Sequence, residues 1–454
     1  MSFTSINPAT GESFHQQPAW HEKELETALT SVAAATPAWA NKGITERCQH
    51  LYAIADLLRQ RKDELARLIT LEMGKLFSEA QGEIEKCALG CEYYAQNAIG
   101  FLADEVIPSD AGHSCVARLP IGTVLAVMPW NFPFWQVFRF AAPTLAAGNT
   151  AVLKHASNVP QCALAIEQLF IDAGFPPHVF RSLMIRADQV QRVIEDPRIH
   201  AVTLTGSEPA GRQVAASAGA ALKKTVLELG GSDAFIILED ADLDQAIPVA
   251  VASRFMNAGQ SCIAAKRFIV VDRIADEFSQ RFSTAIKGLR CGDPFATDTT
   301  LAPMARNDLR DELHQQVQAS INNGAIAITG CQPQAGDGAW YQASLLDHVS
   351  IGMPAFDEEL FGPVASIIRV NDEQQALSVA NGSRFGLGGS VWTRDTQRGE
   401  QLARQIQAGA VFVNGLVKSD PRLPFGGIKA SGYGRELSHY GMHEFVNHKT
   451  LWIR

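Results

Sequence analysis

The sequence predicts an α/β fold in which a doubly wound parallel sheet is followed by a second α/β domain. Short apolar runs alternate with helical stretches along most of the chain, a pattern typical of parallel sheets that helices cover on both faces. The 454 residues are enough for two or three domains, each with its own core. Hydrophobic residues make up 46% of the chain and charged residues 19%, as in an ordinary globular protein.

The elements follow in order along the chain. From residue 22 to about residue 103, apolar side chains recur at three- and four-residue steps, which predicts helices. A first series of strands is predicted at 123–128, 150–154, 200–205 and 234–238, with helices such as 161–173 between them. The second series has strands predicted at 268–271, 325–329, 365–370, 389–392 and 410–414. Because no obvious linker separates the two series, we expect the domains to pack closely.

Charge and composition argue against several classes of function. The net charge of −9 argues against a nucleic-acid surface. No signal peptide is apparent at the N-terminus, and Arg139 interrupts the apolar run at 132–147, so we expect no membrane association. The eight cysteines form no paired framework, and Cys87 and Cys91 lack a second ligand pair with zinc-site spacing. We therefore expect a reduced, cytoplasmic protein without a metal site.

Cys262 is the first candidate for chemistry. It closes a loop that contains Gly259 and follows the run Glu228-Leu229-Gly230-Gly231. A thiol in such a loop can act as a covalent nucleophile, and a carboxylate such as Glu228 can activate the water that releases an acyl group. Most cysteines of cytosolic proteins are small buried hydrophobes, so this interpretation depends on the other motifs.

Two predicted strands end in residues that suit a phosphate or a ribose. Gly206 and Ser207 join a strand to a predicted helix at 208–220, whose free N–H groups and dipole favour an anion. The G-x-G-x-x-G fingerprint is absent, and such a turn, taken alone, is more typical of an ordinary connection between a strand and a helix. Lys154 ends another strand, where ligands of open sheets collect, although a solvated strand-end lysine is an equal alternative.

Three further segments indicate a function only when they are considered together with the other motifs. Pro129 and Pro133 bracket a rigid loop with Asn131, whose side-chain N–H could donate to a developing oxyanion; an aromatic plug with an Asn turn is the alternative. By composition, residues 357–363 form an acidic loop, and the glycines of 424–436 indicate turns or close backbone approach.

Taken together and in this order, these motifs resemble the aldehyde dehydrogenase superfamily, most closely its succinate semialdehyde dehydrogenase branch. The match runs from Ile6-Asn7-Pro8 to the C-terminal Trp452-Ile453-Arg454. The resemblance implies an aldehyde dehydrogenase-like α/β architecture and a homodimer or homotetramer. Its parts are an NAD(P)-binding domain at 1–101 and 121–230, a catalytic domain at 231–430, and a small β oligomerisation element at 102–120 and 431–454.

The resemblance also implies roles for single residues. Cys262 matches the nucleophile, Asn131 the side chain of the oxyanion hole, and Glu228 the base that hydrolyses the thioester. Glu359 matches a contact to the nicotinamide ribose, and Phe361 one that packs near the ring. The cofactor residues implied are Trp130, Lys154, Ser157, Gly206, Ser207, Glu359 and Phe361.

Ser157 bears on the choice of cofactor. Many family members carry Pro-Ser-Glu after the cofactor lysine, and that Glu repels a 2′-phosphate. This chain has His155-Ala156-Ser157 instead, so the charge clash is removed. We expect both NAD and NADP to be used.

Arg139 bears on the substrate. It stands eight residues after Asn131, where the succinate semialdehyde branch has an Arg that meets the distal carboxylate. A guanidinium facing a carboxylate in a sheltered tunnel is a strong and selective contact. Ser419 and Phe425 are assigned to the same pocket, and Arg422 is a further candidate at its mouth. The alternative is that Arg139 forms an internal salt bridge on its helix.

The reaction expected is therefore NAD(P)-dependent oxidation of succinate semialdehyde to succinate through a thiohemiacetal and a thioester. Glutarate semialdehyde is an alternative substrate, because one methylene changes binding by only about 1–3 kcal/mol. A CoA-acylating enzyme is disfavoured by the presence of Glu228. The alternative from a different class is a catalytically retired relative with a structural or binding role.

Overall fold

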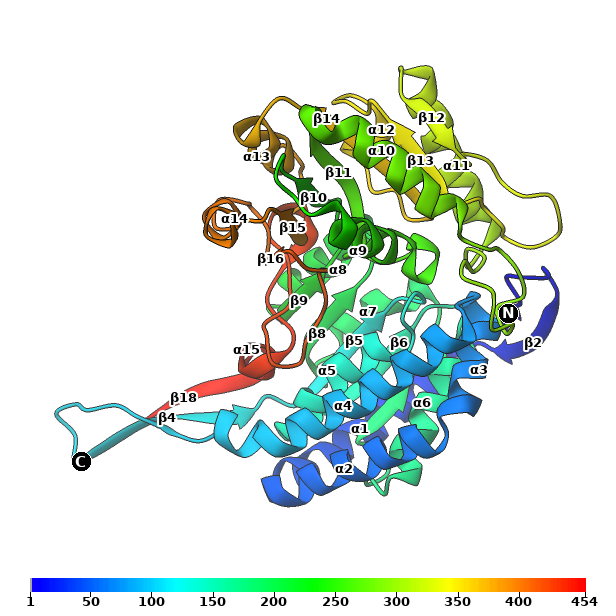
Figure 1. Cartoon of the computed structure of the whole chain (residues 1–454). Coiled ribbons are helices and arrows are strands. Elements are labelled where there is room, and N and C mark those ends of the chain that lie inside the picture. The colour runs from blue at the N-terminus through cyan, green and yellow to red at the C-terminus, as the bar shows by residue number, and fades with distance from the viewer. Residues whose placement is uncertain (1) are drawn as a thin grey trace.

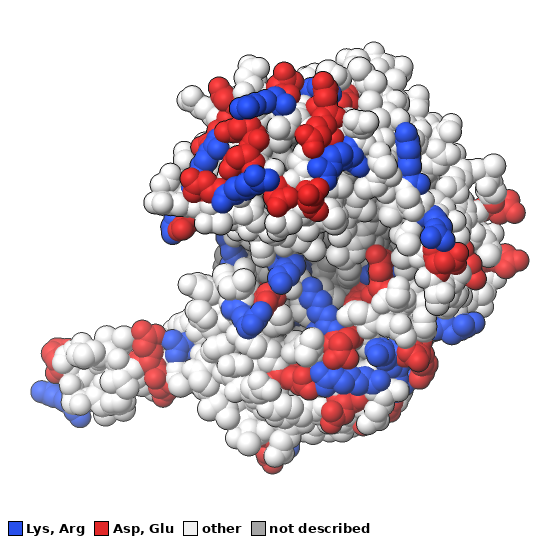
Figure 2. All heavy atoms as spheres, in the orientation of Figure 1, with Lys and Arg blue, Asp and Glu red and all other residues white. Residues whose placement is uncertain are grey.

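The fold consists of two bodies with a thin arm projecting from one of them (Figure 1). The structure is a computed structural model and describes residues 2–454. No helix among these residues is long and apolar enough to cross a membrane. On the face in Figure 2, acidic and basic side chains are mixed, and a hollow lies between the two bodies.

The first body contains a six-stranded sheet of mostly parallel strands. In spatial order these are β17 (Gly432–Tyr433), β9 (Lys224–Glu228), β8 (Ile199–Thr205), β5 (Thr123–Met128), β6 (Thr150–His155) and β7 (Phe180–Ser182). Its larger helices are α1 (Glu22–Ala40), α2 (Ile44–Gln60), α3 (Lys62–Met73), α4 (Phe77–Phe101), α5 (Trp135–Ala146) and α6 (Pro160–Asp172). Its shorter helices are α7 (Val190–Glu195), α8 (Glu208–Ala220), α15 (Ser438–His443) and the 3-10 turn Ala187–Gln189.

Alternation along the central strands builds two cores in this body. In β5, Val124 packs into the core that contains α2 to α6, whereas Leu125 packs into the core that contains α1, α7 and α8. Ala151 and Val152 of β6 divide in the same way. Successive side chains of a strand point to opposite faces, so a strand covered on both faces is apolar throughout.

The second body contains a seven-stranded sheet. In spatial order its strands are β12 (Ile326–Thr329), β13 (Ser344–Asp347), β14 (Val364–Val370), β11 (Ala265–Val271), β10 (Asp233–Ile237), β15 (Gly388–Trp392) and β16 (Ala410–Val413). Its helices are α9 (Leu243–Phe255), α10 (Asp272–Lys287), α11 (Asn307–Asn322), α12 (Pro354–Asp357), α13 (Glu373–Asn381), α14 (Thr396–Ala403) and the 3-10 turns Met256–Gly259 and Lys429–Ser431.

For two strands, the position in the sheets differs from what their order along the chain predicts. The run at 234–238 reads as the fourth strand of the first series, but β10 lies in the second sheet, between β11 and β15. Alternation signals that a strand exists but not which sheet it joins, and the chain crosses between the bodies at Gly230-Gly231. The run at 325–329 is the only antiparallel strand of the second sheet, at its edge.

The arm is a three-stranded antiparallel sheet formed by β18 (Val446–Ile453), β4 (His113–Pro120) and β3 (Glu105–Val106). β18 and β4 pair along their whole length, from Val446 with Pro120 to Ile453 with His113. The segment before β18 does not belong to the arm, because β17 pairs with β9 in the first sheet. A separate hairpin, β1 (Ser2–Ile6) with β2 (Ser13–Pro18), begins the described chain.

The carboxyl edge of the first sheet faces the amino edge of the second. β5, β6 and β8 are parallel, so the loops after Met128, His155 and Thr205 leave the carboxyl edge of the first sheet. In the second sheet, Cys262 precedes β11 and Phe361 precedes β14, which places both at the amino edge. Functional residues far apart in sequence are therefore collected between the bodies.

Candidate active site

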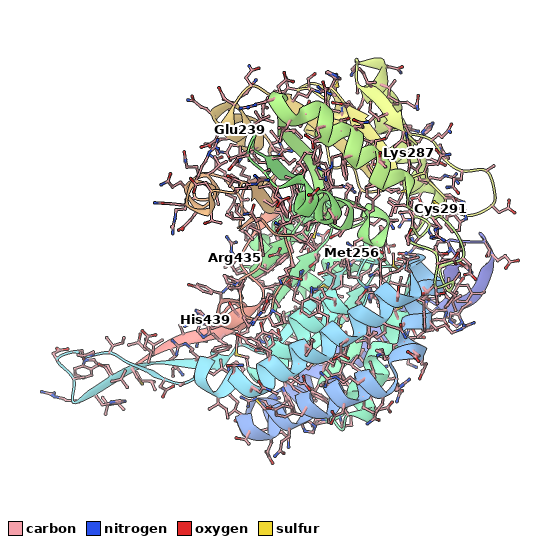
Figure 3. The ribbon with its side chains drawn as sticks, viewed as in Figure 1. Glu239, Met256, Lys287, Cys291, Arg435 and His439 are labelled. Carbon is pink, nitrogen blue, oxygen red and sulfur yellow. The ribbon has the colours of Figure 1, made fainter. Side chains whose placement is uncertain are left out.

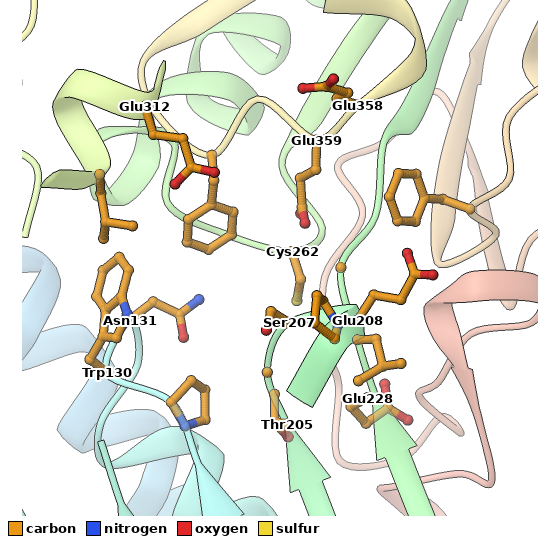
Figure 4. A pocket seen from close by; sticks show the side chains of 18 of the residues that line it. Trp130, Asn131, Thr205, Ser207, Glu208, Glu228, Cys262, Glu312, Glu358 and Glu359 are labelled. Atoms are coloured by element: carbon orange, nitrogen blue, oxygen red, sulfur yellow. The ribbon is translucent and has the colours of Figure 1, made fainter. Parts of the chain in front are cut away.

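Two cavities meet at Cys262. The larger, of about 480 Å³, runs between the turn at Gly206 and the loop that carries Glu359 and Phe361 (Figure 4). The smaller, of about 100 Å³, lies on the side of Arg139. Cys262 is on the wall of both. A group attached to its sulfur would therefore face both spaces.

The loop before Cys262 is held in a tight conformation. Asn257 and Ala258 have φ values of 53° and 51°, in the left-handed region that non-glycine residues rarely adopt. Two buried cations hold the loop carbonyls: Arg254 Nη2 donates to Gly259 O at 2.7 Å, and Lys266 Nζ donates to Cys262 O at 2.8 Å. These contacts fix the backbone of the nucleophile candidate.

Asn131 is fixed against the same loop. Its Nδ2 donates to Gln260 O at 3.1 Å, and its own backbone carbonyl accepts from Asn257 Nδ2 at 2.9 Å. An amide nitrogen carries two hydrogens, so one remains for a substrate. Within residues 2–454, no backbone acceptor lies on the Cys262 N–H either. In the described chain, the site therefore holds two N–H groups without acceptors next to the thiol: one of Asn131 Nδ2 and that of the Cys262 backbone.

Burial disfavours the thiolate form of Cys262. Burial raises its pKa to about 12, although the positive charges of Arg139 and Lys266 act in the opposite direction. Only Cys262 and Cys291 among the eight cysteines are half-buried, and the other six are buried. The structure therefore distinguishes Cys262 by access and position rather than by a lowered pKa.

Glu228 ends β9 and is buried, and neither of its carboxylate oxygens has a hydrogen-bond partner in the described part of the chain. Burial raises its pKa well above the ordinary value, and the negative charge of Glu436 raises it further. Glycine at 426 leaves the carboxylate its space, because a Cβ there would lie 2.7 Å from Glu228 Oε1. A buried carboxyl group of this kind can take part in proton transfer once it loses its proton.

The larger cavity has an aromatic wall and a polar wall. The rings of Trp130 and Phe361 meet edge to face, 5.9 Å apart. Glu359 Oε1 accepts from Gly231 N at 3.1 Å and lies 3.2 Å from Lys266 Nζ. The Gly206 N–H donates to Glu228 O at 3.0 Å, so this amide is already used.

Three of the remaining cofactor candidates stand at the carboxyl edge of the first sheet. Ser207 is exposed at the N-terminus of α8 and lines the larger cavity. Lys154 is buried at the end of β6, has no carboxylate within ion-pair distance in the described chain, and has its pKa lowered by burial. Ser157 is exposed just beyond it, and neither Lys154 nor Ser157 lines the larger cavity.

Arg139 lies on the wall of the smaller cavity but is already paired. Its guanidinium forms a buried ion pair with Glu436, and its Nη2 donates to Thr205 Oγ1 at 3.3 Å. The guanidinium carbon lies 4.7 Å from the centre of the Phe425 ring. An internal ion pair thus exists, but with a partner from another segment and not from the same helix.

Ser419 and Phe425 also line the smaller cavity, and both are buried. Ser419 Oγ accepts hydrogen bonds from Lys86 Nζ at 2.6 Å and from Trp135 Nε1 at 3.1 Å. Arg422 lies elsewhere: its guanidinium pairs with Asp420, and it lines neither cavity.

Comparisons with known proteins identify the family of the chain. Residues 1–451 match the aldehyde dehydrogenase family. The chain belongs to the aldehyde dehydrogenase family. It is 50% identical over 453 residues to a probable succinate-semialdehyde dehydrogenase [NADP(+)] of Synechocystis sp., with both chains covered in full.

Two further relatives carry related names. The chain is 47% identical to a succinate semialdehyde dehydrogenase [NAD(P)+] of Escherichia coli, over 99% of this chain and 97% of that one. It also superposes on the crystal structure of succinic semialdehyde dehydrogenase from Streptococcus pyogenes in complex with NADP+, with a TM-score of 0.98, 39% identity and 99% of each chain covered.

Some residues of this aldehyde dehydrogenase site are not evident from its sequence. Lys86 lies in a long helix of regular periodicity, where a lysine reads as part of a solvated face. Glu436 follows a glycine-rich segment, and Lys266 lies inside a strand. Each acts through a partner distant in sequence, and a single chain offers no signal for such pairs.

Proposed function

We propose that this aldehyde dehydrogenase oxidises succinate semialdehyde to succinate and accepts NADP as well as NAD. The observation that carries the proposal is the position of Cys262 on the walls of both cavities. One cavity offers an aromatic wall and a helix N-terminus for a dinucleotide. The other offers a cationic wall for a short carboxylated aldehyde. The names of the relatives from Synechocystis and Escherichia coli support the same substrate.

The proposed reaction begins at the thiol. The Cys262 sulfur loses its proton and attacks the aldehyde carbon, and the carbonyl oxygen becomes an oxyanion. The second N–H of Asn131 Nδ2 and the backbone N–H of Cys262 are assigned to that oxygen. The bound dinucleotide supplies a hydride acceptor for this carbon. Loss of the hydride converts the thiohemiacetal on Cys262 to a thioester.

Glu228 is assigned to the second half of the reaction. Its carboxyl group must first release its own proton, because burial raises its pKa. It then takes a proton from water, the resulting hydroxide attacks the thioester carbon, and succinate and the Cys262 thiol are released. The buried environment suits this role, because a base with a raised pKa holds a proton more strongly.

The residues present fit a dinucleotide. Lys154 is a buried cation with no carboxylate partner among residues 2–454, and Trp130 with Phe361 offers a surface for a flat ring. Ser157 brings no negative charge to the edge beside Lys154. We expect Ser157→Glu to lower kcat/KM for NADP more than for NAD, because the new carboxylate repels the 2′-phosphate. Ser157→Ala, which adds no charge, is the control, and an equal loss with both cofactors would contradict the assignment.

The test of the substrate is a comparison of kcat/KM for succinate semialdehyde, glutarate semialdehyde, butanal and benzaldehyde, each with NAD and NADP. A strong lead of the two carboxylated aldehydes over butanal supports the proposal. Equal kcat/KM values for butanal or benzaldehyde would not affect the family assignment, but they would contradict succinate semialdehyde as the substrate.

We further propose that the enzyme is a cytoplasmic homodimer or homotetramer. All eight cysteines are unpaired, as expected in a reducing compartment. The arm exposes apolar side chains, with Val106, Trp452 and Ile453 more than half exposed. Such a patch on a thin projection favours burial against a second copy of the chain.

A further inference from the structure

Lys266 is the second residue of β11, and its side chain is only 1% exposed. The strand follows the loop that starts at Met256, between the two bodies (Figure 3). A buried ammonium is costly unless each of its three N–H groups has an acceptor. Lys266 Nζ donates to Ser261 O at 2.9 Å and to Cys262 O at 2.8 Å, and it lies 3.2 Å from Glu359 Oε1. All three donors are therefore directed at groups beside the thiol.

The contact to Ser261 O bears on catalysis because of the peptide group to which this oxygen belongs. The Ser261 carbonyl and the Cys262 N–H are the two ends of one peptide group, and that N–H is a donor assigned to the oxyanion. Ser261 O also accepts from Ala264 N at 3.2 Å, so both of its lone pairs are used. Hydrogen bonds to a carbonyl oxygen polarise the whole peptide group and make its N–H a stronger donor.

Arg254 shows how the contact made by Lys266 differs from a purely structural one. Arg254 Nη2 donates to Gly259 O at 2.7 Å in the same loop. The N–H of that peptide group belongs to Gln260 and donates to Asn257 O at 3.0 Å. Polarising this peptide group therefore strengthens a bond inside the loop. The Cys262 N–H has no acceptor in residues 2–454, so polarising its peptide group benefits a ligand instead.

The charge of Lys266 also acts on the thiol. Burial raises the pKa of Cys262, and the positive charges of Arg139 and Lys266 oppose this effect. Glu359, whose carboxylate points toward Cys262 in Figure 4, raises the pKa. Lys266 thus favours both anions of the first chemical step, the thiolate and the oxyanion.

We propose that Lys266 strengthens the oxyanion hole by polarising the Ser261–Cys262 peptide group. It is a positioning residue, because it acts through the Cys262 N–H and lines neither of the two cavities that meet at the thiol. This inference rests on the proposed function, in which that N–H meets the aldehyde oxygen. A fixed charge near a developing anion has a larger effect in a buried site than in water, because little solvent screens it.

The experiment compares wild type, Lys266→Met, Lys266→Arg and Arg254→Met in the absence of cofactor. The probe for the oxyanion hole is p-nitrophenyl acetate. The Cys262 thiolate attacks its acyl carbon, the carbonyl oxygen becomes an oxyanion, and nitrophenolate leaves, so the initial burst of nitrophenolate reports this step. The probe for the thiol alone is iodoacetamide, because alkylation displaces iodide and forms no oxyanion. The ratio of the two rates at one pH separates the oxyanion hole from the thiol pKa.

We expect the ratio to fall about 10-fold in Lys266→Met, less than the roughly 100- to 1,000-fold of losing an oxyanion donor outright. Lys266→Arg keeps the charge and should retain most of the ratio. Methionine matches the unbranched stem of lysine more closely than arginine does, so a role in packing alone predicts the reverse order. That reverse order would overturn the inference.

Arg254→Met is the matched control, because it removes a buried cation from the same loop but from a different peptide group. Its ratio should fall less than that of Lys266→Met. An equal fall would mean that rigidity of the loop, and not charge on the Ser261 carbonyl, sets the reactivity, which overturns the inference. Thermal unfolding and NADP binding establish that each variant is folded. If Lys266→Met does not fold, Lys266→Gln, a neutral donor, replaces it and should give a ratio below that of Lys266→Arg.

The outcomes separate this inference from the proposed function, because the ester assay does not depend on which aldehyde is the substrate. A wild-type enzyme without a burst would contradict the thiol chemistry of the proposed function and this inference together. A wild-type burst whose ratio to alkylation is unchanged in Lys266→Met overturns only the inference.

Turnover with saturating NADP gives a second readout. In Lys266→Met the kcat for succinate semialdehyde should fall while its KM changes little, because the oxyanion forms only after the aldehyde binds. A higher KM with an unchanged kcat would instead make Lys266 a residue of substrate binding and would overturn the inference.

Discussion

At the scale of the residue, access separates Cys262 from most of the other thiols. Under mild iodoacetamide treatment we expect Cys262 and Cys291 to be labelled before the six buried cysteines. Because burial raises the pKa of Cys262 to about 12, its labelling rate should still be rising between pH 7 and pH 9. Peptide mass spectrometry with time measures both effects. Cys291→Ser removes the competing site, and labelling of all eight cysteines at one rate would contradict the assignment.

Glu436 sets the environment of the base candidate. Its negative charge raises the pKa of Glu228, so Glu436→Gln should lower that pKa, and the freed Arg139 should lower it further. The deprotonated form of Glu228 then appears at lower pH. The acidic limb of the pH profile should move in that direction in the steady-state phase after the first turnover, which reports thioester hydrolysis.

Glu444→Gln is the matched control for this prediction. Glu444 also raises the pKa of Glu228, but it is the last of the causes in size. Its shift should have the same sign and be smaller. An unmoved limb in Glu436→Gln would mean that burial alone sets the pKa of Glu228.

The sequence is sufficient to nominate residues whose type is unusual for their place. Asn131 between two prolines and Cys262 behind a glycine both draw attention, and the structure brings them to one loop contact. Lys86 and Glu436 give no such signal, because a lysine on a helix and a glutamate after a turn are ordinary. Their importance arises from partners more than 290 residues away, as with Lys86 and Ser419, where the separation is 333 residues.

At the scale of the element, α5 is the support for much of the smaller cavity. It carries Trp135 and Arg139, and its first residues have no capping side chain of their own. Glu83 from α4 provides the cap instead: its Oε1 accepts from Phe134 N at 2.9 Å and from Trp135 N at 3.0 Å. A carboxylate at a helix N-terminus satisfies free N–H groups and meets the helix dipole favourably.

Loss of the Glu83 charge should destabilise the enzyme. Glu83→Gln keeps an acceptor for α5 but leaves the buried Lys75 without its ion-pair partner. Breaking a buried pair in this way costs about 3–5 kcal/mol. The apparent Tm should therefore fall well below that of Glu85→Gln, which removes a partly exposed pair with Arg59. Equal Tm values for the two variants would contradict a stabilising role for the buried Lys75–Glu83 pair.

The sequence predicts the limits of some elements but not the sheet that each strand joins. Strands at 123–128 and the helix at 208–220 are predicted to the residue, because apolar runs and a proline in the first turn mark their limits. The sheet to which the run at 234–238 belongs is not predictable in the same way. β10 pairs with β11 and β15, and β15 lies more than 150 residues further along the chain.

At the scale of the whole molecule, the carboxyl edge of one sheet faces the amino edge of the other, and the arm extends away from both (Figure 1). The first arrangement is what collects Asn131, Glu228 and Cys262 at one place. It follows from how two domains pack, which local patterns do not encode. The arm has a different consequence, because β18 leaves one edge unpaired along its whole length.

The free edge of β18 and its exposed apolar side chains predict that the arm holds copies of the chain together. Trp452 and Ile453 are 51% and 56% exposed, and an exposed edge strand of this kind is a template for pairing. In a symmetric interface each substitution acts twice, and burying one such side chain contributes about 1.5–3 kcal/mol. Trp452→Glu combined with Ile453→Glu should therefore shift the mass in solution toward the 49.2 kDa monomer, as measured by light scattering after size-exclusion chromatography. Asn447→Glu adds a charge to an exposed polar position of the same strand and should keep the oligomer. If the double variant kept it as well, assembly would have to use another surface, because two buried carboxylates at the end of β18 would oppose pairing through the arm.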